Sequence, residues 1–208
     1  MMVLSGSMYS ATLRGKTHLT VLLPSDSQDY GDGTPIVLQS PYKTLYLLHG
    51  MGGDDSDWIT HTDLSHLAKR NGFCVVLPSC LSTFYEGPWG EYVGSELVET
   101  TRRTFPLSSR QEDTWIMGAS MGGWGALHIA STYPGTFGRC IALSTATMGR
   151  PVPHPCCQLY LGCGTEDPLL AENRDIARLL GSGLHTTAGG HDWHYWNSVL
   201  TSLFQPAS

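Results

Sequence analysis

Three residues whose side chains can jointly cleave an acyl bond stand at well-separated points of this chain. Ser120 is the centre of a G-x-S-x-G pentapeptide at residues 118–122, and Asp167 and His191 follow it in that order. A serine hydroxyl attacks a carbonyl carbon efficiently when a base accepts its proton, which an imidazole can do. A carboxylate beside the imidazole fixes its tautomer and stabilises its charged form. We therefore predict Ser120 as the nucleophile, His191 as the general base and acid, and Asp167 as the residue that orients His191.

Attack by a serine creates an oxyanion, and the sequence offers backbone donors that could stabilise it. The N–H of Met121 directly follows the nucleophile, and a second donor should come from the glycine-rich loop at residues 49–53. In that loop we predict Met51 as the donor, with Gly52 as the rival. Gly50 is expected to border the substrate, because glycine allows a close approach of the backbone.

Aromatic residues near the expected mouth of the site could contact a substrate, although aromatic side chains more often belong to the core. Two of them, Trp124 and Trp89, are the predicted substrate contacts, since Trp124 opens the helix that follows the nucleophile. The full set of aromatic candidates is Trp58, Tyr85, Trp89, Tyr92 and Trp124.

Each catalytic assignment has a competitor nearby in the sequence. Glu166 and Asp192 are alternative carboxylates, and His185 and His194 are alternative bases. Asp167 also precedes a proline, which suits a residue that only caps a helix. We prefer His191 to His194 because His194 falls inside the last predicted helix, away from the end of a strand.

Apolar runs alternate with amphipathic runs along the chain, which predicts a mainly parallel sheet covered by helices on both faces. Two extended segments around Gly15, at 8–14 and 16–24, should add an antiparallel hairpin, and a polar loop should follow at 25–41. The other expected strands are 44–48, 73–77, 115–118, 140–144, 159–162 and 184–188, and the expected helices are 63–70, 95–105, 122–133, 169–180 and 193–204. Each candidate catalytic segment directly follows a strand, where α/β proteins bind their ligands.

The order serine, acid, histidine at strand ends is that of the α/β-hydrolase fold. Three segments, at 46–53, 118–126 and 189–196, resemble the esterase D-like putative esterase family. That family includes tributyrin esterases, feruloyl (cinnamoyl) esterases, S-formylglutathione hydrolases and mycolyltransferases, and the resemblance covers nearly the whole chain. The third segment, with Trp193 and Trp196 after the histidine, is most similar to the tributyrin and feruloyl branch. The resemblance implies an α/β-hydrolase fold and hydrolysis of carboxylic esters without a cofactor.

The chain departs from this family in one connection. Members commonly carry a longer insertion between the strand after the nucleophile helix and the strand before the acid. Here only residues 145–155 separate them, and Pro151, Pro153 and Pro155 disfavour a helix. We therefore expect the cap over the site to be reduced to a short loop, which leaves the acyl site open.

Composition narrows the alternatives further. With 14% charged and 41% hydrophobic residues, the 208 residues are expected to form one globular domain, 1–208. The net charge of −6 disfavours nucleic acid and anionic membranes as partners, and no apolar run has the length of a transmembrane helix. The spacing of the six cysteines and nine histidines predicts free thiols and no metal site. The first residues lack a secretory signal pattern, so a cytoplasmic location is expected.

Taken together, these features predict a serine carboxylesterase that acts on short-chain acyl esters, with acetyl or feruloyl esters among the candidates. Its partner is a small-molecule ester, no cofactor is needed, and a homo-oligomer is compatible with the sequence. The alternatives are an acyltransferase or an S-formylglutathione hydrolase with the same triad. A non-catalytic binding module is the remote alternative, because such a protein would be expected to have lost part of the triad.

Overall fold

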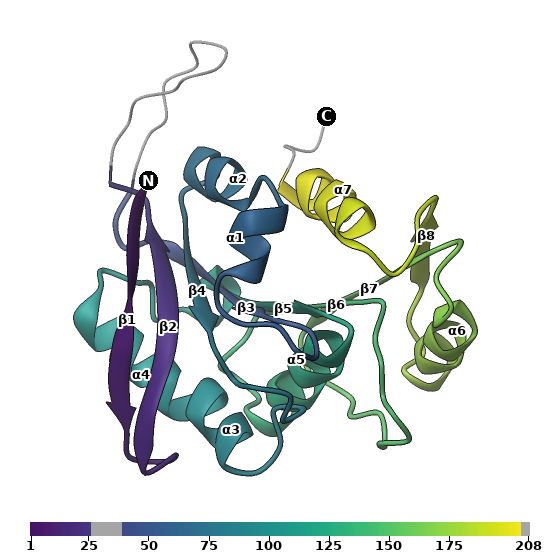
Figure 1. Ribbon diagram of the computed structural model, residues 1–208, viewed down its shortest axis with the longest axis horizontal. Coiled ribbons are helices and arrows are strands. Elements are labelled where there is room, and N and C mark those ends of the chain that lie inside the picture. The colour runs from purple at the N-terminus through teal and green to yellow at the C-terminus, as the bar shows by residue number, and fades with distance from the viewer. Residues whose placement is uncertain (26–38, 205–208) are drawn as a thin grey trace.

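The computed structural model describes residues 1–25 and 39–204, so most of the loop expected at 25–41 lies outside the described residues. The strands are β1 (Met2–Ser10), β2 (Gly15–Leu23), β3 (Lys43–Leu48), β4 (Phe73–Pro78), β5 (Thr114–Ala119), β6 (Arg139–Leu143), β7 (Gln158–Gly164) and β8 (Leu184–Thr187). They form one sheet in the order β1-β2-β4-β3-β5-β6-β7-β8 (Figure 1). β2 is antiparallel to β1 and β4, and the remaining pairs are parallel. The predicted α/β fold with an N-terminal antiparallel hairpin is confirmed.

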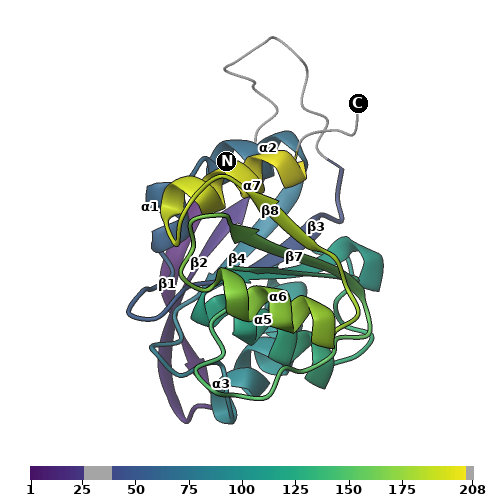
Figure 2. The same cartoon turned by 90° about the vertical axis from the view of Figure 1, so that its right-hand side faces the viewer.

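Helices cover both faces of this sheet. They are α1 (Asp57–His61), α2 (Leu64–Arg70), α3 (Pro88–Glu91), α4 (Leu97–Thr104), α5 (Met121–Thr132), α6 (Leu170–Leu179) and α7 (Trp193–Phe204). α1, α2 and α7 lie on one face and α3 to α6 on the other, as Figures 1 and 2 show from two directions. Within the described ranges, no helix is long and apolar enough to cross a membrane.

Side chains that alternate along the central strands supply two separate cores, one for each helical layer. In β3, Leu45 and Leu47 belong to the core under α2 and α7, whereas Tyr46 and Leu48 belong to the core under α4 and α5. All four side chains are at most 1% exposed. Strands buried on both faces in this way read as continuous apolar runs, which is why residues 44–48 are recognisable in the sequence.

The N-terminal hairpin lies further toward the N-terminus than predicted. The strand expected at 8–14 was wrong. β1 ends at Ser10, and the chain turns before Gly15 rather than around it. Arg14 adopts a left-handed conformation with φ 51°. Glu96 is the residue before α4, and its carboxylate accepts hydrogen bonds from residues 10–12. These bonds stabilise the turn between β1 and β2. A contact between segments so distant in sequence leaves no local signal.

The connection from β6 to β7, residues 144–157, contains no helix, in agreement with its prolines. Its first part is attached to α6. The Asn173 side chain accepts a hydrogen bond from the Thr145 N–H at 2.9 Å and donates one to the Thr145 carbonyl at 3.0 Å. The Glu172 carboxylate accepts the N–H of Thr147 at 2.9 Å. This start of the connection is therefore fixed.

Candidate active site

The sharp turn predicted at Ser120 is present between β5 and α5. Ser120 adopts φ 58° and ψ −122°, which residues other than glycine rarely do, and its N–H donates to the Leu143 carbonyl at 2.9 Å. A Cβ atom at Gly118 would lie 2.2 Å from the Gly122 carbonyl oxygen, and one at Gly122 would lie 2.6 Å from the Leu48 carbonyl oxygen. Both flanking positions therefore require glycine, as the pentapeptide predicts.

We expect Gly118→Ala to destabilise the protein by about 3 kcal/mol, because the new methyl group overlaps the backbone of Gly122, which cannot move aside as a flexible side chain could. In a chain of this size, that loss lowers Tm by roughly 6–12 °C in a thermal melt. Gly183→Ala is the matched control, since a Cβ at Gly183 meets nothing within 4 Å. Equal melting temperatures for the two variants would contradict this account of the turn.

Ser120, His191 and Asp167 are brought together at the carboxyl end of the sheet. The His191 Nε2 lies 3.0 Å from the Ser120 Oγ, and its Nδ1 lies 3.2 and 3.1 Å from the two Asp167 oxygens. Because a carboxylate only accepts hydrogen bonds, Nδ1 carries the proton and Nε2 is free to accept one from the serine hydroxyl. The Asp167 side chain is fully buried, whereas that of His191 is 27% exposed. This arrangement allows Ser120 to lose its proton to His191 as it attacks a carbonyl.

The competing carboxylates and histidines do not reach Ser120 in this way. Glu166 accepts hydrogen bonds from the neighbouring threonine hydroxyl and from a backbone N–H after β8. Asp192 accepts a backbone N–H of α7 at 2.9 Å. His185 stacks on Tyr160 with ring centroids 4.4 Å apart, and His194 is exposed on α7. The structure thus favours the preferred residue in each comparison.

Two backbone N–H groups near Ser120 are available to an oxyanion. Among the described residues, neither the Met51 N–H nor the Met121 N–H donates to a protein acceptor. The N–H of Gly52, the rival donor, is occupied by the Ser82 hydroxyl at 3.0 Å. Met121 begins α5, so its N–H also lies at the positive end of the helix dipole. The geometry supports Met51 and Met121 as the pair of donors.

His49 holds the glycine-rich loop at residues 49–53 in place by hydrogen bonds, a role that the sequence did not reveal. Its Nδ1 donates to the Gly50 carbonyl at 2.7 Å, and its Nε2 accepts the Cys80 N–H at 2.9 Å. The Tyr85 hydroxyl donates to the His49 carbonyl at 2.9 Å. Burial lowers the pKa of His49, which keeps the ring neutral as these contacts require. The loop before Met51 is therefore fixed by a neutral histidine.

A pocket of about 290 Å³ opens beside Ser120, and Gly50 and Met51 border it. Its aromatic wall comes from Trp58 of α1 and from Trp193 and Trp196 of α7. These rings pack edge to face, with the centroids of Trp193 5.2 Å from Trp58 and 4.9 Å from Trp196. Trp196 also contacts the His191 ring edge to face at 5.2 Å. The pocket is open to solvent at the carboxyl end of the sheet.

The two tryptophans predicted as substrate contacts lie outside the lining of this pocket. Trp124 is 2% exposed, and its indole N–H donates to the Pro151 carbonyl at 3.1 Å. Its ring stacks on His128, one helical turn further along α5. Trp89 of α3 packs edge to face on Tyr92. Both rings belong to the layer under α3 to α5, whereas the pocket opens toward α1 and α7.

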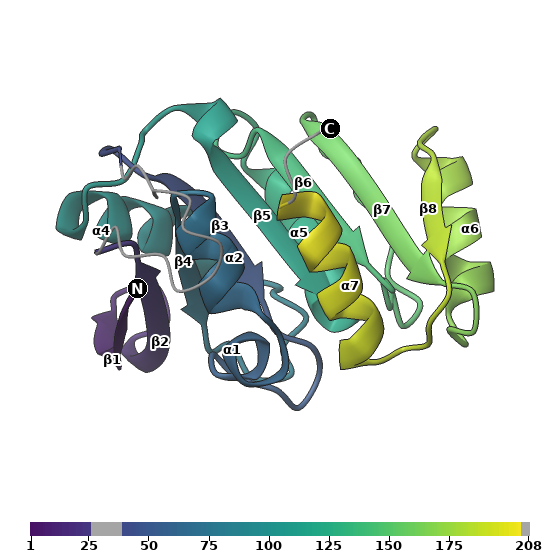
Figure 3. The same ribbon diagram turned by 90° about the horizontal axis from the view of Figure 1, so that it is seen from above.

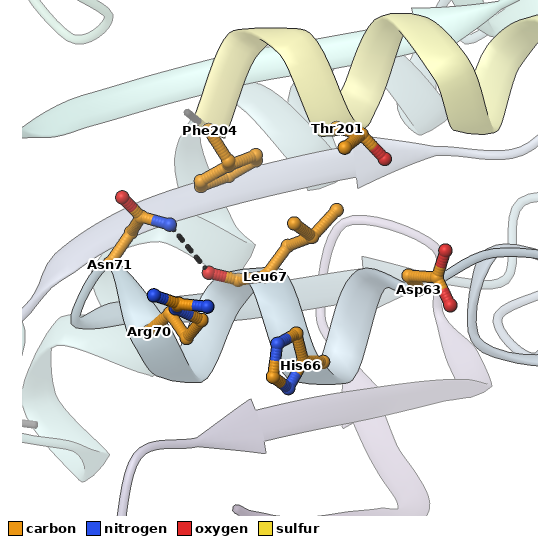
Figure 4. A pocket seen from close by; sticks show the side chains of 7 residues that line it. All are labelled: Asp63, His66, Leu67, Arg70, Asn71, Thr201 and Phe204. Atoms are coloured by element: carbon orange, nitrogen blue, oxygen red, sulfur yellow. Dashed lines mark hydrogen bonds between the residues drawn. The ribbon is translucent and has the colours of Figure 1, made fainter. Parts of the chain in front are cut away.

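A larger pocket, of about 540 Å³, lies between α2 and α7 (Figure 4). In it the Asn71 amide donates to the Leu67 carbonyl at 2.9 Å, and His66 and Arg70 line one side. None of its lining residues is a serine or cysteine. It therefore offers no serine or cysteine nucleophile, and the smaller pocket beside Ser120 is the candidate active site.

Comparisons with known proteins agree with this geometry. Residues 80–176 match a family model described as "Putative esterase". An acetyl esterase from Caldicellulosiruptor saccharolyticus is 30% identical over 99% of this chain and 97% of its own. FphF, a fluorophosphonate-binding serine hydrolase of Staphylococcus aureus, has the same fold, with a TM-score of 0.82 at 23% identity over 99% of both chains. An S-formylglutathione hydrolase of Staphylococcus aureus superposes with a TM-score of 0.80 at 22% identity, over 98% of this chain and 97% of the other. The chain belongs to the putative esterase family of α/β-hydrolases, and it is a carboxylic ester hydrolase.

Proposed function

We propose that this esterase hydrolyses short-chain acyl esters through an acyl-enzyme on Ser120. The observation that carries the proposal is the continuous contact from the buried Asp167 carboxylate through His191 to the Ser120 hydroxyl, 3.0 Å from Nε2. The N–H groups of Met51 and Met121, which donate to no described protein acceptor, support it, because the two residues follow the adjacent parallel strands β3 and β5 at the same end of the sheet.

Each step of the reaction uses one of these groups. The Ser120 oxygen attacks the ester carbonyl as its proton passes to His191, and the oxyanion is stabilised by the two N–H donors. Collapse breaks the bond to the alcohol oxygen, which takes the proton from His191. Water then repeats the sequence on the acyl-enzyme and releases the acid. Asp167 stays ionised and holds the imidazole in its tautomer throughout.

The size of the pocket supports a small acyl group. A volume of about 290 Å³ lies at the lower end of the range for small-molecule sites, and tryptophan rings close one side of it. The acetyl esterase relative supports the same choice. We infer that acetyl and butyryl groups fit beside Ser120, whereas longer acyl chains must project from the pocket and gain less from burial.

A panel of p-nitrophenyl esters tests the proposal. We expect kcat/KM for the acetate and butyrate to exceed that for the octanoate by at least about tenfold, or about 1.4 kcal/mol of transition-state binding. Feruloyl esters and S-formylglutathione belong in the same panel, assayed by release of ferulate and of formate. A preference for the octanoyl ester, or for S-formylglutathione over all oxygen esters, would overturn the assignment to short-chain acyl esters.

A further inference from the structure

The outer edge of β1 is an unprotected sheet edge. No described residue pairs with it, and residues 2–10 contain neither a charged residue nor a proline. Proteins usually protect such edges with charges, prolines, bulges or very short strands. The opposite edge follows this rule, because β8 has only four residues. Figure 3 shows the two strands at the two ends of the sheet.

Large apolar side chains are concentrated on this strand. Val3 is 54% exposed, Leu4 39% and Tyr9 66%, and Met2 beside them is 46% exposed. A groove of about 440 Å³ runs along the strand between β1 and α4, and Leu4 and Met8 line it. An uncharged edge of nine residues with such side chains is suited to pairing with another strand rather than to exposure.

The order of residues along β1 is symmetric about Gly6. Ser5 and Ser7 flank the glycine, Leu4 and Met8 come next, and Val3 and Tyr9 follow. If two copies of this strand meet antiparallel with Gly6 opposite Gly6, then within residues 3–9 each serine faces a serine and each apolar residue faces an apolar residue, whereas Met2 faces Ser10 at the ends. We propose that β1 pairs with β1 of a second copy of this chain, antiparallel and centred on Gly6, so that one continuous sheet runs through a two-fold dimer.

In this register, apolar side chains would cover one another on both faces of the paired strands. Val3 and Tyr9 point to one face of β1, so Val3 of each copy would pack against Tyr9 of the other. Pairs of a β-branched and an aromatic residue on facing strands are favourable. Leu4 and Met8 point to the other face, where the Tyr92 hydroxyl already contacts the Met8 sulfur at 3.8 Å. The second copy's Leu4 and Met8 would therefore lie over the apolar groove beside α4.

The absence of charge favours a second copy over a foreign strand. Like charges that face each other across a two-fold axis repel, and β1 has none to repel. A two-fold interface also requires one surface to be complementary to itself, which the symmetry about Gly6 provides. The glycine sits at the point of closest approach, and a Cβ added there meets nothing within 4 Å in the single chain. A side chain at this position would disturb only the pairing.

Gly6→Lys tests the interface, with Gly183→Lys as the matched control at another open glycine. The wild type and the control should sediment as dimers at micromolar concentration. Gly6→Lys, which places two lysines directly opposite each other, should raise the dimer Kd at least about 30-fold. All three should retain esterase activity and the same far-UV spectrum. A monomeric wild type, or a Gly6→Lys protein that stays dimeric, would overturn the proposal, as would a dimer between this edge and a different protein's strand.

Single cysteines test the register. Under mild oxidation Gly6→Cys should form a covalent dimer, because the residue on the two-fold axis faces itself. Ser5→Cys alone should cross-link poorly, whereas the double variant Ser5→Cys with Ser7→Cys should cross-link well. The unmodified protein controls for its native cysteines, of which Cys156 is exposed. Efficient cross-linking of Ser5→Cys alone, with none for Gly6→Cys, would show a different register.

Discussion

Replacing Ser120 with alanine is expected to lower kcat/KM for p-nitrophenyl acetate by about 10⁴-fold or more. The loss is large because the acyl-enzyme route then has no nucleophile. His191 remains 27% exposed and can still activate water weakly. The two proposed oxyanion donors at Met51 and Met121 remain as well, so a low residual rate above that of the uncatalysed reaction is expected. Steady-state hydrolysis at neutral pH measures the effect.

A fluorophosphonate probe gives the same prediction a second readout. It should label the wild type covalently and leave Ser120→Ala unlabelled, with intact mass measured on both. Ser202→Ala is the control, since Ser202 is exposed on α7 and its hydroxyl donates only to the Val199 carbonyl. If Ser120→Ala keeps full activity or is still labelled, the nucleophile has been assigned to the wrong residue.

The second large effect is expected for Asp167→Asn, which should lower kcat by about 10³- to 10⁴-fold with little change in KM. The asparagine amide can donate to the His191 Nδ1, which then acts as acceptor. In that tautomer Nε2 carries the proton and cannot take one from Ser120. The volume at position 167 is unchanged, so the substrate pocket should still bind an ester. Initial rates over a range of substrate concentrations separate kcat from KM.

Glu166→Gln is the matched control for this variant. Glu166 neighbours Asp167 and carries the same charge, but its contacts are with Thr165 and with the Gly189 N–H, which a glutamine oxygen can still accept. We expect its kcat to stay within about threefold of the wild type. The reverse result, a large loss for Glu166→Gln and a small one for Asp167→Asn, would assign the orienting carboxylate to Glu166.

The sequence predicted those parts of the molecule whose signals are local. Strands buried on both faces read as apolar runs, and the pentapeptide at 118–122 requires glycine for steric reasons that hold in any strand–turn–helix unit. The placement of Ser120, Asp167 and His191 at one edge then follows from the rule that parallel strands end together. These parts of the prediction needed no knowledge of packing.

Parts that depend on contacts between distant segments were missed. Residues 88–94, which the structure continues as helical turns, were not predicted as helical, and their glycines Gly90 and Gly94 have low helix propensity. In the structure both glycines are packing positions: a Cβ at Gly90 would lie 2.5 Å from the Tyr85 carbonyl oxygen, and one at Gly94 would lie 2.2 Å from the Tyr133 ring. Of the pocket wall, Trp58 was among the aromatic candidates, whereas Trp193 and Trp196 were not predicted to contact substrate. The side of α5 on which a tryptophan lies is set by the core that the helix packs against. In this structure Trp124 therefore lies away from the candidate site.

The short connection after β6 is anchored at its start and again around Pro151, whose carbonyl accepts the Trp124 indole N–H, while the Arg150 guanidinium lies over the Phe84 ring. Thr145 and Thr147 are fixed by Asn173 and Glu172, and the chain beyond Thr147 carries the exposed Met148. Loop-closure entropy rises only slowly with length, so added residues there would cost little stability. We therefore expect the exposed turn at Met148 and Gly149 to accept a grafted lid that leaves both anchors and the elbow in place. Substrate range could be re-engineered at this point while the machinery that cleaves the ester stays intact.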